Sequence, residues 1–149
     1  MFQAATELGG VLTGVDAGCR RGLAQYGMHL GTAFQIADDV LDYQSDSETI
    51  GKNVGDDLAE GKNTLPLIYA MRDGNAAQRD LVANAIRNAD INALADVIEI
   101  VKDTGALELS MKRASVSSAA AISALAPLEP SPYRDALECI AEYSFNRTL

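Results

Sequence analysis

Apolar residues recur at helical spacing through most of this chain, and that period constrains the possible fold more than any other feature. One face of a long helix is outlined by such a run: Leu23, Tyr26, Leu30, Phe34, Ala37 and Leu41. Asp16 is a suitable N-cap for this helix, which we predict to continue to about Tyr43. Because the spacing is helical rather than strand-like almost throughout, the sequence predicts an all-α fold. With no repeat and no clear linker, we predict that residues 1–149 form a single all-α unit.

Glycine and proline divide the rest of the sequence into shorter segments. We predict a loop from Gly51 to Asn63, followed by a helix that begins at Thr64 and stops near Asp73. Amphipathic spacing predicts further helices at about 81–89, 94–101, 107–125 and 134–145. The last of these has an expected apolar face formed by Leu137, Ile140, Ala141 and Phe145.

Composition excludes several classes of protein. The net charge of −9 argues against nucleic acid as the main partner, because phosphate backbones are bound by basic patches. The segment from Met1 to Leu12 contains Glu7 and lacks Lys and Arg, which is the wrong polarity for a secretory signal. No apolar run reaches membrane-spanning length, so no integral membrane segment is predicted. Cys19 and Cys139 lack zinc-ligand spacing and are interpreted as reduced, which together with the rest predicts a soluble, cytoplasmic protein.

Three aspartates interrupt the apolar face of the long helix. Asp38 and Asp42 are separated by about 40° around a helix axis, so they share a face, whereas Asp39 lies about 100° away. Like charges at this spacing disfavour a helix by roughly 0.2 to 0.5 kcal/mol, so something must offset the repulsion. A hard divalent cation such as Mg²⁺ does so, since it is bound through oxygen and bridges one or two carboxylates to substrate phosphates. The alternative is a solvated acidic face near a helix end.

The segment after the aspartates favours the metal interpretation. Lys52 follows Gly51, and Lys62 follows Gly61, so two lysines downstream of the carboxylates can meet a phosphate from the side opposite the metal. The neighbouring pair Asp56 and Asp57 is interpreted as capping or ordering this loop.

Three linked motifs carry a resemblance to a known family. They read GTAFQIADDVLDY at 31–43, GKNVGDDL at 51–58 and EGKNTLPL at 60–67. Together they resemble the second aspartate-rich region of the polyprenyl diphosphate synthase family of trans-isoprenyl diphosphate synthases, octaprenyl diphosphate synthases among them. The resemblance implies an all-α helical bundle of the isoprenoid synthase type, of which this chain would be the C-terminal half.

The same resemblance implies an activity and a set of site residues. The family elongates an allylic prenyl diphosphate with isopentenyl diphosphate in a Mg²⁺-dependent transferase reaction. The implied catalytic residues are Asp38, Asp39, Asp42 and Lys52, and the three aspartates are the implied Mg²⁺ ligands. Lys52 and Lys62 would contact the diphosphate of the allylic substrate, and Gln35 would line the same site.

Other family features are missing from this sequence. A complete synthase has another Asp-Asp-x-x-Asp motif upstream and basic residues for isopentenyl diphosphate, and neither is present. We therefore expect the chain alone to be inactive, and we expect its exposed apolar surfaces to drive homo-oligomer formation. The alternative is a non-catalytic helical partner or regulatory subunit of a full-length prenyl synthase. A Ca²⁺-binding helical module fails on ligand spacing, because Val40 and Ile50 interrupt the candidate loops.

Overall fold

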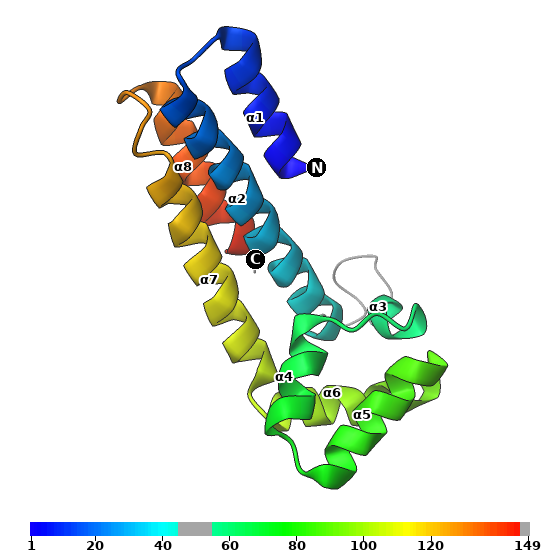
Figure 1. Ribbon diagram of the computed structural model, residues 1–149. Helices are drawn as coiled ribbons and strands as arrows, with labels where there is room; N and C mark the ends of the chain where they lie inside the picture. The colour runs from blue at the N-terminus through cyan, green and yellow to red at the C-terminus, as the bar shows by residue number, and fades with distance from the viewer. Residues whose placement is uncertain (45–54, 147–149) are drawn as a thin grey trace. The chain divides into compact units, whose positions relative to one another are not determined.

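A computed structural model describes residues 1–44 and 55–146, which form helices and connecting turns without any β-strand (Figure 1). The elements in chain order are α1 (Phe2–Thr13), α2 (Ala17–Gln44), α3 (Asp56–Ala59), α4 (Leu65–Asp73), α5 (Ala76–Asn88), the 3₁₀ helix η1 (Ile91–Ala93), α6 (Leu94–Asp103), α7 (Ala106–Ala124) and α8 (Pro132–Phe145). The predicted all-α class is therefore confirmed. None of the helices described here has the length and apolar character needed to cross a membrane.

The described residues group into two compact units. The first unit contains Met1–Ala37 and Arg113–Leu149, and the second contains Asp38–Lys112. Helices α2 and α7 each contribute residues to both units. The prediction of a single domain over 1–149 stays a prediction.

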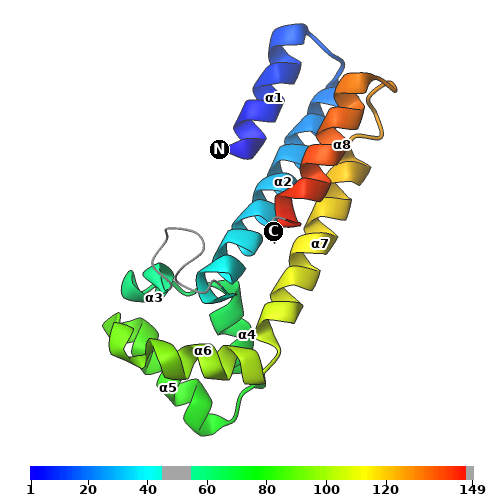
Figure 2. The ribbon, with the colours of Figure 1, turned by 180° about the vertical axis from the view of Figure 1, so that it is seen from behind.

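The first unit combines α1 and α8 with most of α2 and α7. Figures 1 and 2 show α1 alongside α2, and α8 alongside α2 and α7. Its core is formed by Tyr26, Leu30, Ala121, Leu125 and Ala141. Asp16 begins α2 as predicted, because its Oδ1 accepts hydrogen bonds from the backbone N–H groups of Gly18 (2.6 Å) and Cys19 (3.1 Å). This side chain satisfies two of the N–H groups that a helix start leaves unpaired.

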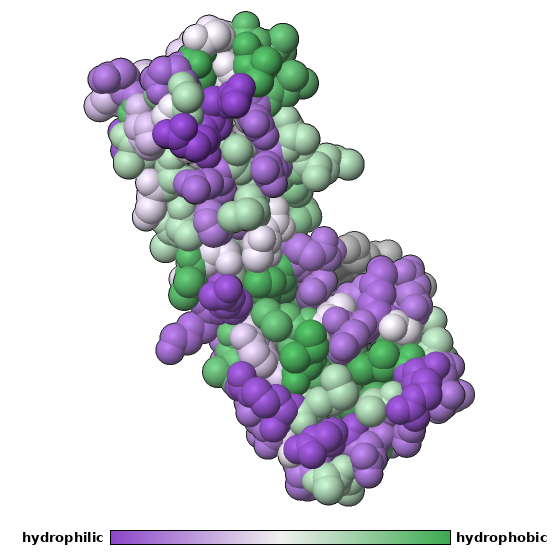
Figure 3. Space-filling view, viewed as in Figure 1, coloured by the Kyte–Doolittle hydropathy of each residue, from purple (hydrophilic) through white to green (hydrophobic). Residues whose placement is uncertain are grey.

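Helix α1 packs against α2 through a glycine. A Cβ placed on Gly27 would lie 2.6 Å from the carbonyl oxygen of Phe2 and 2.8 Å from the Cα of Gln3, so only glycine permits this approach. The Thr6 hydroxyl then donates a hydrogen bond to the Leu23 carbonyl at 2.6 Å. Helix α1 also leaves apolar side chains exposed, Leu12 by 78%, and hydrophobic residues gather over its C-terminal end in Figure 3.

The second unit packs α3 to α6 with the end of α2 and the start of α7. Its core is aliphatic and contains Val40, Leu58, Leu67, Val82, Val97, Ile100, Val101 and Leu107, together with Tyr43 and three alanines. Asn75 and Gln78 form a capping box at the start of α5, with each side chain accepting a hydrogen bond from the backbone N–H of the other residue. These contacts hold the short helices around the end of α2.

Three details differ from the sequence predictions. Helix α1 was not predicted as a separate element. Helix α3 lies inside the predicted loop, because four residues are too few to display a helical period. In α8, Ile140 is 51% exposed although it was assigned to the apolar face, and Ser144 is buried in its place. A small serine side chain fits where α8 packs closely against its neighbours, so Ser144 is buried although it is less apolar than Ile140.

Candidate functional site

The end of α2 presents the aspartates at the edge of the aliphatic core. Val40 and Tyr43 are 1% and 2% exposed and anchor this turn in the core of the second unit. Asp38, Asp39 and Asp42 occupy the remaining positions of the turn and are all half-buried. The buried side chains of Val40 and Tyr43 therefore fix the backbone of this turn, while the three carboxylates remain partly exposed to solvent.

Asp42 connects α2 to the start of α3. Its Oδ2 accepts a hydrogen bond from the backbone N–H of Asp57 at 3.2 Å, and its backbone carbonyl accepts one from the N–H of Gly55 at 3.2 Å. Burial raises the pKa of the Asp42 carboxyl, and the hydrogen bond from Asp57 opposes that rise. Nothing in the local sequence pattern pairs residues 42 and 57, so this contact was not predicted.

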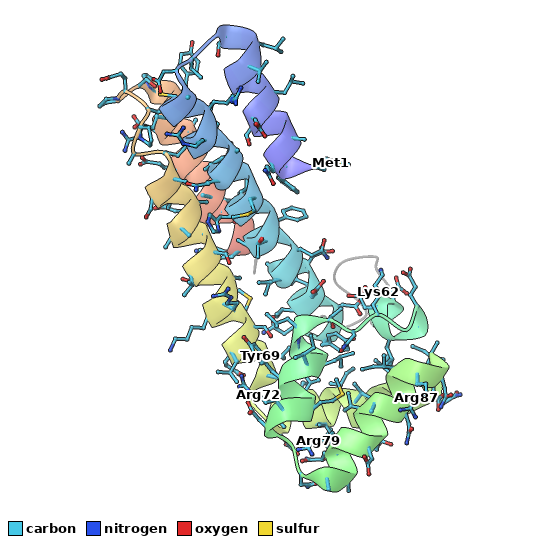
Figure 4. All side chains as sticks on the ribbon, in the orientation of Figure 1. Met1, Lys62, Tyr69, Arg72, Arg79 and Arg87 are labelled. Atoms are coloured by element: carbon cyan, nitrogen blue, oxygen red, sulfur yellow. The ribbon has the colours of Figure 1, made fainter. Side chains whose placement is uncertain are left out.

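Asp57 in turn connects to Lys62. The Lys62 ammonium lies 3.1 Å from the Asp57 carboxylate and 2.7 Å from that of Glu60, and the Lys62 N–H donates to the Asp57 carbonyl at 2.8 Å. Figure 4 shows Lys62 beside α3. Hydrogen bonds to the carboxylates of Glu60, which has the larger effect, and of Asp57 raise the pKa of Lys62. The ammonium therefore remains charged at neutral pH. These contacts give Asp57 the loop-ordering role that the sequence suggested.

Behind the carboxylates, two hydroxyls are buried in the second unit. Tyr43 is 2% exposed and Thr64 is 7% exposed, and neither hydroxyl makes a hydrogen bond of regular geometry within 1–44 or 55–146. Burial raises the pKa of Tyr43, and an interaction with Thr64 opposes that rise. Thr64 stands at the N-cap of α4, as predicted, but its side chain makes no capping hydrogen bond there.

The remaining predicted residues are not all part of this arrangement. Gln35 is exposed on α2, one turn before Asp38. Lys52 lies outside the described residues. Within 1–44 and 55–146 no three acidic, His or Cys side chains converge as a ready-made metal cage. Magnesium does not require one, because it usually keeps several waters and takes one or two protein carboxylates together with phosphate oxygens.

The fold and the site define an all-helical protein with an acidic turn at the end of its longest helix and a lysine-bearing turn fastened beside it. The chain belongs to the polyprenyl synthetase family, whose sequence model matches residues 1–104. The resemblance stated from the motifs is thereby confirmed.

Individual relatives agree with this assignment. The chain is 44% identical over 147 residues to an all-trans-nonaprenyl-diphosphate synthase of Rhodobacter capsulatus, covering 99% of this chain and 45% of the relative. It is 43% identical over 148 residues to octaprenyl diphosphate synthase of Escherichia coli, covering 99% of this chain and 46% of that protein. The chain thus spans about half the length of the curated relatives it matches.

A solved structure shows the same fold. Polyprenyl synthase from Caulobacter crescentus, crystallised with calcium and isoprenyl diphosphate, superimposes with a TM-score of 0.89 at 37% identity. The match covers 99% of this chain and 46% of that structure.

Proposed function

We propose that this chain forms part of a trans-prenyltransferase that elongates an allylic diphosphate with isopentenyl diphosphate. Membership of the polyprenyl synthetase family supports the reaction class. The observation that carries the proposal is a pair of contacts: Asp42 accepts a hydrogen bond from the Asp57 backbone, and Asp57 forms an ion pair with Lys62. These contacts connect the turn that carries the aspartates, which would bind a metal, to Lys62, which would bind a diphosphate.

In this proposal the aspartates of α2 hold the metal. Asp38 and Asp39 are half-buried carboxylates at the end of α2, and a hard cation such as Mg²⁺ takes only one or two protein carboxylates beside phosphate oxygens. Mg²⁺ is our choice of ion, and the calcium in the Caulobacter relative supports a divalent ion there. When bound, Mg²⁺ would stabilise the negative charge that develops on the departing diphosphate. The motifs predict that Asp42 binds the same metal, but its carboxylate accepts a hydrogen bond from the Asp57 backbone N–H.

Lys62 would contact the diphosphate, with Lys52 and Gln35 as further contacts predicted from the motifs. The Lys62 side chain is 53% exposed and that of its partner Glu60 is 62% exposed, so this ion pair is weak and a diphosphate can replace it. A lysine that stays protonated stabilises charge on the leaving group without transferring a proton.

Turnover by the complete gene product that contains this chain tests the proposal. Asp38→Ala should lower the rate of isopentenyl diphosphate incorporation on the order of 100-fold, the scale of losing one charge-stabilising group in a transition state. Asp39→Ala should have a smaller effect, and Lys112→Ala, an exposed change on α7, is the matched control and should leave the rate near that of the parent. Equal rates for Asp38→Ala and the parent would refute the metal role.

The same assay separates the enzyme from a non-catalytic helical partner. A partner protein would raise the turnover of an added prenyl synthase without its own aspartates being needed. The inactivity of the isolated chain, its homo-oligomeric state and its cytoplasmic location remain predictions from the sequence.

A further inference from the structure

We propose that Asp42 is a positioning residue, which caps the start of α3 from a distance and so holds Lys62, rather than a ligand of the metal. Three contacts within the second unit carry this inference, and all of them involve residues that the structure describes. The part that concerns diphosphate binding by Lys62 rests on the proposed function; the capping role does not.

Helix α3 has no capping side chain at its own N-cap position. Its N-cap is Gly55, which lies in the left-handed region with φ 90° and has no side chain to accept a hydrogen bond. Every helix start leaves backbone N–H groups without an acceptor, and an Asp, Asn, Ser or Thr side chain at the N-cap normally accepts from the second or third of them. Asp57 is the second residue of α3, so its N–H is one that a capping side chain would serve.

Asp42 meets this need from 15 residues away in the sequence. Its Oδ2 accepts from the Asp57 N–H at 3.2 Å, in the manner of an N-cap side chain, while its own carbonyl accepts from Gly55. One residue of α2 therefore fixes both the residue that precedes α3 and its first turn. The close fit of Gly55 adds to this, because a Cβ there would lie 2.6 Å from a methyl group of Leu94 on α6.

The contact depends on hydrogen-bond acceptance rather than on negative charge. Asp56 and Asp57 occupy the first turn of α3, so two further carboxylates lie near that of Asp42. An amide oxygen accepts the same hydrogen bond and adds no repulsion. Asparagine at position 42 should therefore preserve the cap, whereas a metal ligand would lose most of its value on the same change.

The cap reaches Lys62 through Asp57. The backbone of Asp57 is held by Asp42, and its carboxylate and carbonyl both bind Lys62, at 3.1 Å to the ammonium and 2.8 Å to the backbone N–H. Leu58, between these contacts, is fully buried and fixes the other face of α3. Releasing Asp42 would let the first turn of α3 fray and would move the cation that we assign to the diphosphate.

Hydrogen exchange of the Asp57 amide, followed by NMR in the 149-residue chain, tests the cap. Asp42→Ala should reduce the protection of this amide by about tenfold, whereas Asp42→Asn should keep it within about threefold of the parent. Asp56→Ala is the matched control, since it removes a neighbouring exposed carboxylate and should leave the Asp57 amide protected. Unchanged protection in Asp42→Ala would overturn the cap, and Asp42→Asn keeps the test valid if the alanine variant does not fold.

Binding of Mn²⁺ in the presence of inorganic diphosphate, measured by paramagnetic line broadening, tests whether Asp42 is a ligand. Asp38→Asn should weaken Mn²⁺ binding by at least about tenfold, and Asp42→Asn should change it by less than about threefold. An equal loss in both variants would overturn the inference. The amide measurement decides the cap separately, and the turnover of the Asp38→Ala variant decides the proposed function.

Discussion

The two units of this protein bury their helices by different means. In the first unit, helices approach closely over small residues: Gly27 meets α1, and Ala121 and Ala141 sit in the core. Close approach lets side-chain hydroxyls bond to backbone carbonyls of neighbouring helices. Tyr26 donates to the Leu137 carbonyl at 2.8 Å, and Ser118 donates to the Ala141 carbonyl at 2.7 Å.

The second unit relies on branched aliphatic side chains instead. Its core contains the fully buried side chains of Leu58, Leu67, Val82 and Val97. Its described contacts between helices include the hydrogen bond from the Asp57 N–H on α3 to the Asp42 carboxylate on α2. The comparison shows a division of labour. Small residues set helix spacing in the first unit, whereas buried aliphatic residues in the second unit pack beneath the turn that carries the aspartates.

The largest effect should come from removing bulk in the second unit. Leu67→Ala should lower the free energy of unfolding by about 2–5 kcal/mol, because Leu67 is fully buried and its loss leaves a cavity. Ile68→Ala is the matched control next in sequence, where the side chain is 40% exposed and the loss should be much smaller. Urea denaturation measures both, and similar losses would show that the aliphatic core is not what stabilises this unit.

The converse change should damage the first unit. Gly27→Ala should cost about 1–3 kcal/mol, because the added methyl meets backbone atoms of α1 as well as the Thr6 hydroxyl. In contrast, Gly9→Ala on α1 has open space around it and should stabilise the helix by up to about 1 kcal/mol. Hydrogen exchange of α1 peptides gives the readout, and changes of the same sign would contradict glycine-mediated packing.

A matched pair of buried tyrosines sharpens the contrast in hydrogen bonding. Tyr26→Phe should destabilise the first unit by about 1 kcal/mol, because it leaves the hydrogen bond to Leu137 unmade. Tyr43→Phe in the second unit should be neutral or stabilising, since the Tyr43 hydroxyl makes no hydrogen bond of regular geometry among the described residues. Thermal unfolding of both variants decides, and a larger loss for Tyr43→Phe would reverse the contrast.

The smallest effect should be one of pH. Hydrogen bonds from Cys19 and from the backbone of Gly18 lower the pKa of the Asp16 carboxyl below its usual range. Because the pKa is lower in the folded state, the stabilisation is present above about pH 4 and is lost as the pH falls through the folded pKa. Asp16→Asn keeps an acceptor that does not titrate, so its stability between pH 5 and 3, roughly, should fall less than that of the parent. Urea denaturation at each pH measures the free energy of unfolding. An equal decrease in the two proteins would show that Asp16 does not contribute to the loss of stability in acid.

Much of the fold was predictable because it depends on local pattern. The apolar period of α2, the Asp16 cap and the helices α4 to α8 follow from residues within one or two turns of each other. Helix α3 did not, since four residues carry no period, and Ile140 was misassigned because the close packing of α8 favours serine. The motif residues were likewise identified from sequence, and family membership confirms the resemblance on which they rest.

Sequence by itself determined the helical class, the family and the shared face of Asp38 and Asp42, because a helix relates residues a few positions apart by simple geometry. Only the tertiary structure decided that Asp42 serves the first turn of α3 and that Asp57 holds Lys62. A hydrogen bond between residues 42 and 57 depends on where α3 packs relative to the end of α2. That packing is set by the burial of side chains such as Leu58 and Leu67 in a shared core, which no local pattern encodes.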